Sequence, residues 1–245
     1  MILDPRRVVP GSIIFIDASF LEFFFSAVFK TLRHPVILIT QNSDLPAPGK
    51  FAHYLDHPNI IHWFGQNCDI KPLHPKFTPI PIGLGNPQWK NGKTKIHDAF
   101  LKELAENSDW PRKNLIYINV RGRVDVVAQV EKNNFSFTAG PKPFKDYFKE
   151  MATYRYVLSP FGAGLDCFRT WEALLVGCVP VVKTSGLDPL YQGLPVVILD
   201  DWSECTEEIV TKKYEQLKNR PVLKEKLFMD YWARLIIDMK KKFLA

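Results

Sequence analysis

Short apolar runs alternate with helix-like segments along most of this chain, and this alternation limits the fold more than any other feature of the sequence. The apolar runs lie at residues 12–16, 36–40, 60–64, 78–83, 115–120, 135–139, 156–160, 179–183 and 195–200. The helix-like segments lie at residues 19–31, 97–107, 143–153, 168–176 and 204–218. Near-continuous apolar strands that alternate with helices are typical of buried parallel sheets. We therefore predict an α/β fold.

A polar stretch at residues 86–114 separates the predicted strands into two sets. It contains a predicted helix but no predicted strand, and Pro111 precedes the next apolar run. We therefore expect two halves, residues 1–110 and 111–245. The last helix-like segment, about 221–242, has apolar residues at helical spacing, so we expect it to cover a sheet or to brace the two halves.

Composition narrows the class of protein. The chain has 245 residues, of which 46% are hydrophobic, and a net charge of +6. These values are ordinary for a globular protein, and a mildly basic one suits a phosphorylated ligand. The sequence has no long block of like charges of the kind that binds nucleic acid, so we expect no nucleic-acid partner. The four cysteines show neither C-x-x-C spacing nor the spacing of zinc ligands, which favours reduced thiols.

Residues 12–29 are the stretch closest to a membrane segment, but they include Asp17 and Glu22. A charge at the centre of a bilayer costs about 2.5–3.5 kcal/mol on insertion scales. The stretch also lacks the small-residue cleavage site of a signal peptide. We interpret it as a strand followed by a buried helix, and we expect a cytoplasmic or otherwise soluble chain without a membrane anchor.

The sequence "SPFGAGLDCFRTWE" at residues 159–172 is the strongest candidate for a binding loop. It joins a predicted strand to a predicted helix, and ligands of open α/β sheets bind at such carboxyl ends of strands. Free N–H groups at the start of the helix favour a phosphate. The spacing of the glycines also suggests a nicotinamide-dependent oxidoreductase. However, Cys167 replaces the third glycine of that fingerprint, and the next strand ends in Lys183 instead of an acidic residue.

Arg169 and Glu172 lie three residues apart, on one face of the predicted helix. A guanidinium group can grip a diphosphate, and a carboxylate can accept hydrogen bonds from ribose hydroxyls. The pair therefore suits a nucleotide sugar, and the alternative interpretation is an exposed salt bridge.

Residues 154–204 resemble the C-terminal part of exostosin-like glycosyltransferases. In that family a strand ending in Ser-Pro is followed by a Gly-x-Gly-x-Asp loop, an Arg, a Glu-Ala-Leu helix and Gly-x-x-Pro-Val. The residues in register here are Ser159, Gly162, Gly164, Asp166, Arg169, Glu172, Gly177 and Pro180. The N-terminal half resembles the family more loosely, through "NSD" at 42–44, "WFGQN" at 63–67 and "IPIGL" at 80–84.

The resemblance implies a GT-B-like fold, in which two Rossmann-like halves with mostly parallel sheets face each other across a cleft. It also implies transfer of a sugar from a nucleoside-diphosphate sugar, UDP favoured over GDP, to a glycan or other hydroxyl acceptor, without a metal or another cofactor. The donor is expected on the C-terminal half and the acceptor on the N-terminal half. Because 245 residues are few for two complete halves, we expect a trimmed sheet. A non-catalytic glycan- or partner-binding relic of the fold remains an alternative.

The predicted donor site gathers residues at the carboxyl ends of the C-terminal strands. Arg169 is expected to stabilise the departing diphosphate, and Arg121 and Arg123 follow the apolar run at 115–120. The full set of predicted donor-binding residues is Arg121, Arg123, Ser159, Gly162, Gly164, Asp166, Arg169, Glu172 and Lys183.

A general base is expected from the N-terminal half. Asp17 and Asp44 each follow an apolar run, and Asp69 is a third option. A single carboxylate base would make the reaction inverting. We expect acceptor contacts from Trp63, Asn67 and Trp89, whereas His62, inside an apolar run, favours a place in the core.

Asp200 and Asp201 are adjacent acidic residues that suggest a metal site, but the sequence offers no third acidic ligand beside them. We expect Asp201 instead to cap a helix that begins near Ser203, and we predict no metal.

Overall fold

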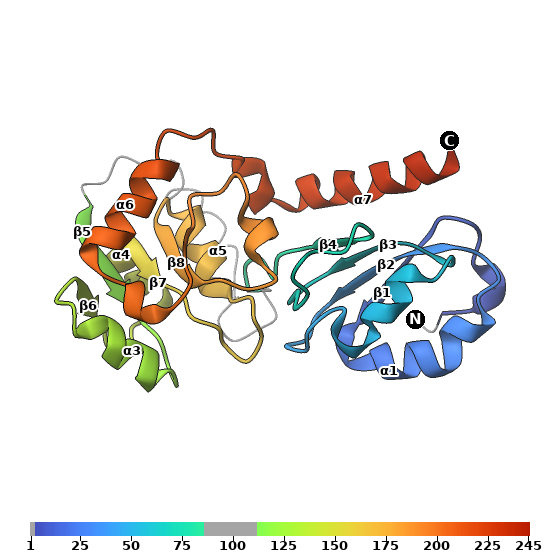
Figure 1. Cartoon of the computed structure of the whole chain (residues 1–245), viewed down its shortest axis with the longest axis horizontal. Helices are drawn as coiled ribbons and strands as arrows, with labels where there is room; N and C mark the ends of the chain where they lie inside the picture. The colour runs from blue at the N-terminus through green and yellow to red at the C-terminus, as the bar shows by residue number, and fades with distance from the viewer. Residues whose placement is uncertain (1–2, 86–111) are drawn as a thin grey trace.

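The computed structural model describes residues 3–85 and 112–245, which form two parallel β-sheets with helices packed on them (Figure 1). The first sheet has the strand order β1-β2-β3-β4, and the second has the order β6-β5-β7-β8-β9. This arrangement confirms the predicted α/β, GT-B-like fold. The boundary near residue 110 and the helix predicted at 97–107 lie outside the described residues.

Each apolar run of the sequence contributes a strand. The first sheet contains β1 (Ser12–Asp17), β2 (Val36–Gln41), β3 (Ile60–Gly65) and β4 (Phe77–Pro79). The second contains β5 (Lys113–Ile118), β6 (Ser136–Thr138), β7 (Tyr154–Leu158), β8 (Val179–Lys183) and β9 (Val197–Leu199). Neighbouring strands in both sheets pair in parallel, so the carboxyl ends of the strands in each sheet meet at one edge.

The segment after β1 is helical, as predicted, but irregular. A 3₁₀ turn at Ala18–Phe20 leads into α1 (Leu21–Phe23), followed by a π turn at Phe24–Val28 and a 3₁₀ turn at Phe29–Thr31. Phe25 is buried there, with its ring 4.0 Å from that of Tyr54. Within residues 3–85 and 112–245, no helix is long and apolar enough to cross a membrane.

Helices cover both faces of the second sheet because alternate residues of each strand point to opposite faces. Ile116 and Ile118 of β5 pack in one apolar cluster with α3 (Val124–Glu131) and α6 (Glu207–Leu217). Tyr117 lies in a different cluster with α4 (Phe144–Ala152) and α5 (Phe168–Leu175). The loops between these strands and helices are thereby held at the sheet edge where a ligand would bind.

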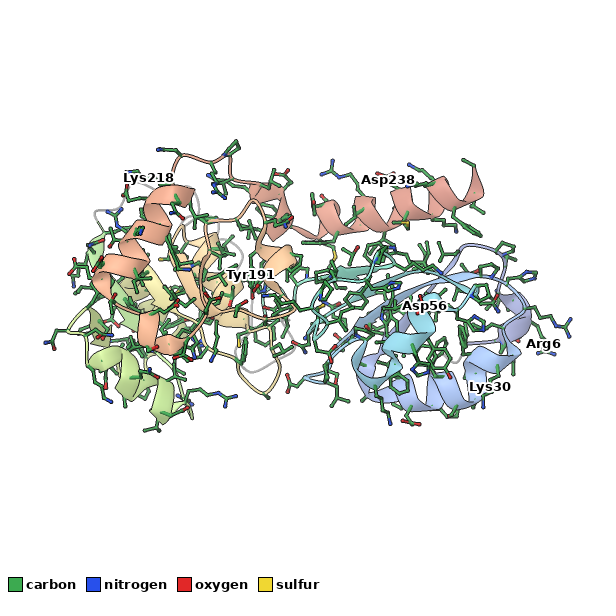
Figure 2. All side chains as sticks on the ribbon, viewed as in Figure 1. Arg6, Lys30, Asp56, Tyr191, Lys218 and Asp238 are labelled. Atoms are coloured by element: carbon green, nitrogen blue, oxygen red, sulfur yellow. The ribbon has the colours of Figure 1, made fainter. Side chains whose placement is uncertain are left out.

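The last helix, α7 (Met229–Leu244), returns to the first sheet (Figure 1). It starts later than predicted because residues 224–227 form a 3₁₀ turn and Phe228 is extended. Its Trp232 is buried in an apolar cluster that contains residues of both halves. Tyr191, labelled at the junction of the halves in Figure 2, belongs to the same cluster.

Candidate active site

A cavity of about 620 Å³ lies between the two halves, at the carboxyl ends of their strands. The N-terminal half contributes Asp44, which follows β2, and residues 82, 84 and 85, which follow β4. The C-terminal half contributes Asn119 and Arg121 after β5, residues of the loop before α4 and of α4 itself, residues 162–164 and 166–169, and Glu172. The site is therefore built at the sheet edges that the parallel topology predicts.

The cavity brings together most of the predicted donor loop. Its lining includes the following predicted donor residues: Arg121, Gly162, Gly164, Asp166, Arg169 and Glu172. Arg169 and Glu172 lie on the first turns of α5 and both face the cavity. The N-cap residue of α5, Cys167, makes no side-chain capping hydrogen bond, and Cys167 and Phe168 both line the cavity. The start of α5 therefore lies at the cavity, and a helix N-terminus favours an anionic ligand.

The two glycines of the loop serve different purposes. A Cβ atom added to Gly164 would lie 2.8 Å from the side-chain Nδ2 of Asn67, so only glycine allows this close approach of the N-terminal half. Gly162 is exposed, and a Cβ atom there would meet only the Sγ of Cys167, at 3.3 Å. Gly162 therefore leaves the loop open towards the cavity, while Gly164 lets the halves pack together.

Glu172 is held by a residue that the sequence analysis did not single out. The hydroxyl of Tyr147, on α4, donates a hydrogen bond to Oε2 of Glu172 over 3.0 Å. Burial raises the pKa of Glu172, against the opposing effects of this hydrogen bond and of the Arg169 charge. Tyr147 lies on α4, the helix that follows strand β6. The order of elements alone could therefore have placed it near the carboxyl ends of the strands, where the donor loop lies.

Asp166 lines the cavity, but its carboxylate is already engaged. It is 3% exposed and accepts hydrogen bonds from the backbone N–H of Ile82 at 2.7 Å and from the indole N–H of Trp171 at 2.9 Å. The N–H of Cys167 also donates to it. Burial raises the pKa of Asp166 to about 6, although these hydrogen bonds act in the opposite direction. Its carboxylate therefore supports the loop and joins it to the N-terminal half.

Three other predicted donor residues lie outside the cavity lining. Arg123 donates from Nε to the carbonyl of Phe161 over 2.7 Å and from its guanidinium group to the carbonyl of Gly162, so it holds the loop in place. Ser159 is buried, with its hydroxyl 2.7 Å from that of Thr170. Lys183 pairs with Asp201 over 2.9 Å. These three side chains therefore have other contacts within the chain, and their contact with the donor stays a prediction.

Asp201 caps the 3₁₀ turn at Trp202–Glu204, as the sequence predicts. Its carboxylate accepts from the N–H of Ser203 over 3.0 Å, and the bond from Lys183 holds the pKa of Asp201 well below its usual value. Within the part of the chain that the structure describes, no group of three or more His, Cys, Asp or Glu side chains is arranged to hold a metal ion.

The candidate bases have different surroundings. Asp44 is exposed and lines the cavity. Asp17 instead caps the turn after β1, accepting from the N–H of Ser19 at 3.0 Å and from its hydroxyl at 2.6 Å. Asp69 accepts from the N–H of Gly49 over 3.1 Å. Of the three, Asp44 lines the cavity, whereas Asp17 and Asp69 lie outside its lining.

Two of the residues expected to contact the acceptor, Trp63 and Asn67, are buried instead. Trp63 is 0% exposed, and its indole N–H donates to the hydroxyl of Thr40 over 2.9 Å, so it is a core residue. Asn67 is also 0% exposed. His62 is a core residue, as predicted: its Nε2 lies 2.7 Å from the hydroxyl of Thr78, and burial lowers its pKa to about 4. Trp89 lies outside the described residues.

Comparison with known proteins places this site in a family. Residues 100–245 match the family described as the RXYLT1 C-terminal domain. Among solved structures, the crystal structure of a GtfA/B complex aligns with a TM-score of 0.41 and 9% sequence identity, over 96% of this chain. The chain spans 59% of the length of that structure. The family match agrees with the motif at residues 159–180: the chain belongs to the RXYLT1 C-terminal domain family, an exostosin-like glycosyltransferase family.

Proposed function

We propose that this chain transfers a sugar from a nucleoside-diphosphate sugar, UDP favoured over GDP, to a glycan or other hydroxyl acceptor. The observation that carries the proposal is the cavity between the halves. It places Arg169 and Glu172 of the family motif on one wall and Asp44 of the N-terminal half on another. The transferred sugar is a hexose or a pentose, and the N-terminal half takes the acceptor.

The donor diphosphate lies against the loop at residues 162–166. Its negative charge grows as the bond to the sugar breaks, so groups that oppose this charge accelerate the reaction. Arg169 and Arg121 line the cavity, and so does Phe168, the first residue of α5, which brings the positive end of the helix dipole to the same place. These groups supply the countercharge without a metal ion. Glu172, oriented by Tyr147, accepts hydrogen bonds from the ribose hydroxyls.

Transfer proceeds in one displacement. The acceptor oxygen attacks the anomeric carbon while the bond from that carbon to the diphosphate oxygen breaks, and the diphosphate leaves with the bonding electrons. The acceptor proton passes to the carboxylate of Asp44, which is exposed at the cavity. Because attack and departure occur on opposite sides of the carbon, the product has the inverted configuration.

Calorimetry and turnover assays test this proposal. We expect UDP to bind more tightly than GDP, NAD⁺ and NADH not to bind, and donor turnover to persist in excess EDTA. Tight binding of NADH without any response to nucleoside diphosphates would favour an oxidoreductase. Binding of UDP without transfer or hydrolysis of any UDP-sugar would favour a non-catalytic relic. Loss of turnover in EDTA with recovery in manganese would contradict the metal-independent mechanism.

A further inference from the structure

The side chain of Asn67 lies between the donor loop and the turn that carries Asp44. Its Oδ1 accepts from the backbone N–H of Asp166 over 2.8 Å. Its Nδ2 donates to the backbone carbonyl of Ser43 over 2.9 Å. Asp166 belongs to the donor loop, and Ser43 directly precedes Asp44. One buried amide therefore joins the two walls of the cavity.

The surroundings of Asn67 fit this bridge closely. Its backbone adopts a φ of 57°, a left-handed conformation that Asn tolerates better than most residues. Gly164 leaves room for the amide, since a Cβ atom at that position would lie 2.8 Å from Nδ2 and 2.9 Å from Oδ1. Because Asn67 is 0% exposed, its side-chain amide cannot contact a bound acceptor substrate.

Neighbouring bonds hold each end of the bridge. On the donor side, the carboxylate of Asp166 accepts from the N–H of Ile82, which belongs to the N-terminal half. On the other side, Nε2 of Gln66 donates to the same Ser43 carbonyl over 3.2 Å. Gln66 thus shares one contact with Asn67 but not the contact with Asp166, which makes it a matched control.

We propose that Asn67 is a positioning residue that fixes the separation between Asp44 and the donor loop; its role in transfer rests on the function proposed above. A displacement of about 1 Å between reacting groups can cost a hundredfold in rate. A buried hydrogen-bonded bridge resists such a displacement, because breaking it leaves polar groups of Ser43 and Asp166 without partners.

Hydrogen exchange tests the bridge without requiring activity. Asn67→Gly keeps the left-handed backbone and removes both side-chain contacts. We expect faster exchange both at the amide of Asp166 and in residues 41–47, by about tenfold or more, whereas Gln66→Ala should affect only residues 41–47. Unchanged protection of the Asp166 amide in Asn67→Gly would overturn the inference. If that variant does not fold, Asn67→Asp carries the test at a pH where the new carboxylate is ionised: it keeps the acceptor for Asp166 but cannot donate to Ser43, so faster exchange is expected in residues 41–47 alone.

Kinetics test the positioning role. We expect Asn67→Gly to lower kcat at least tenfold while the Kd for UDP changes less than threefold. Combined with Asp44→Asn, it should slow the reaction little beyond Asp44→Asn alone, since it acts through that carboxylate. Independent, multiplicative effects of the two substitutions would overturn the inference. Failure of the wild-type protein to bind any nucleoside diphosphate would overturn the proposed function instead, and hydrogen exchange would still decide whether Asn67 joins the two loops.

Discussion

At the scale of single residues, Arg169 and Glu172 share one face of α5 but have different surroundings. Glu172 has one carboxylate oxygen engaged by the hydroxyl of Tyr147, and within residues 3–85 and 112–245 its other oxygen has no hydrogen-bond partner. Arg169 faces the cavity near the loop at residues 162–166. An exposed salt bridge, the alternative interpretation of the sequence, does not describe a half-buried glutamate that is hydrogen-bonded to a tyrosine.

Substitutions at these two positions should have different kinetic effects. Arg169→Ala removes charge from the place where negative charge develops, so we expect kcat to fall about 10²–10³-fold and donor affinity to fall as well. Glu172→Gln weakens recognition of the ribose, so we expect mainly a higher KM, equivalent to about 1–3 kcal/mol. Calorimetry with UDP, single-turnover rates and melting temperatures separate these effects. Equal, small changes in stability alone would show that the motif is scaffold.

Asp44 is the residue whose loss should affect the chemical step with little effect on donor binding. We expect Asp44→Asn to lower kcat on the order of a hundredfold or more. Asp17→Asn is the matched control, because its amide oxygen can still accept from Ser19 and its position lies outside the cavity lining. Normal turnover in Asp44→Asn would place the base elsewhere.

At the scale of elements, the turn between β7 and α5 and the strand β3 each bury a titratable group. For Asp166, burial raises the pKa to about 6 in the folded protein, above its usual value of 3.8. The folded state therefore binds more protons between these values, and stability falls as pH rises through this range. For His62, burial lowers the pKa to about 4 from 6.5, so the unfolded state binds more protons and stability rises with pH.

The two groups should oppose each other between about pH 4 and 6. We expect the unfolding free energy of the wild-type protein to change little across this range on their account. In Asp166→Asn, the remaining contribution of His62 should make the unfolding free energy rise with pH. In His62→Gln, the remaining contribution of Asp166 should make it fall with pH. Urea unfolding at several pH values measures each slope. Identical pH profiles for the two variants would contradict this account of both sites.

The periodicity of the sequence was enough to predict the strands, because each apolar run contributes a strand of a parallel sheet, even where the strand is partly exposed, as in β1 and β6. It was not enough to predict which side chains face the cavity. Trp63 lies in β3 and Asn67 just after it, but both are buried: the ring of Phe25, in the π turn, lies 5.5 Å from that of Trp63, and the donor loop packs on Asn67. Burial of this kind depends on contacts between residues far apart in sequence, such as Asn67 and Asp166.

At the scale of the whole molecule, the two halves share an apolar core as well as a cavity. Trp171 and Leu187 of the C-terminal half pack in the same buried cluster as β1, β2 and β3. Lys71 reaches across to the carboxylate of Asp188 over 2.8 Å. Contacts on this scale fix the separation of the walls of the site, which is why a short chain can keep a defined cavity between its halves.

The last helix extends this shared core, and Trp232 is its anchor. The Trp232 side chain is 7% exposed, and its indole N–H donates to the carbonyl of Lys226 over 2.8 Å. The ammonium group of Lys226 in turn donates to the carbonyls of Leu190 at 3.2 Å and Gln192 at 2.7 Å. The start of α7 is thereby tied to the C-terminal half, while the helix itself packs with the first sheet.

Because Trp232 belongs to a core common to both halves, its loss should destabilise the molecule as one unit. We expect Trp232→Ala to lower the unfolding free energy by about 3–5 kcal/mol, the usual cost of removing a buried Trp. Ile237→Ala is the matched control, since Ile237 lies on the same helix but is 47% exposed and should change stability by no more than about 0.5 kcal/mol. Scanning calorimetry of both variants should show a single transition, at a clearly lower temperature for Trp232→Ala. Two separate transitions, or equal shifts in the two variants, would mean that α7 does not join the halves into one cooperative unit.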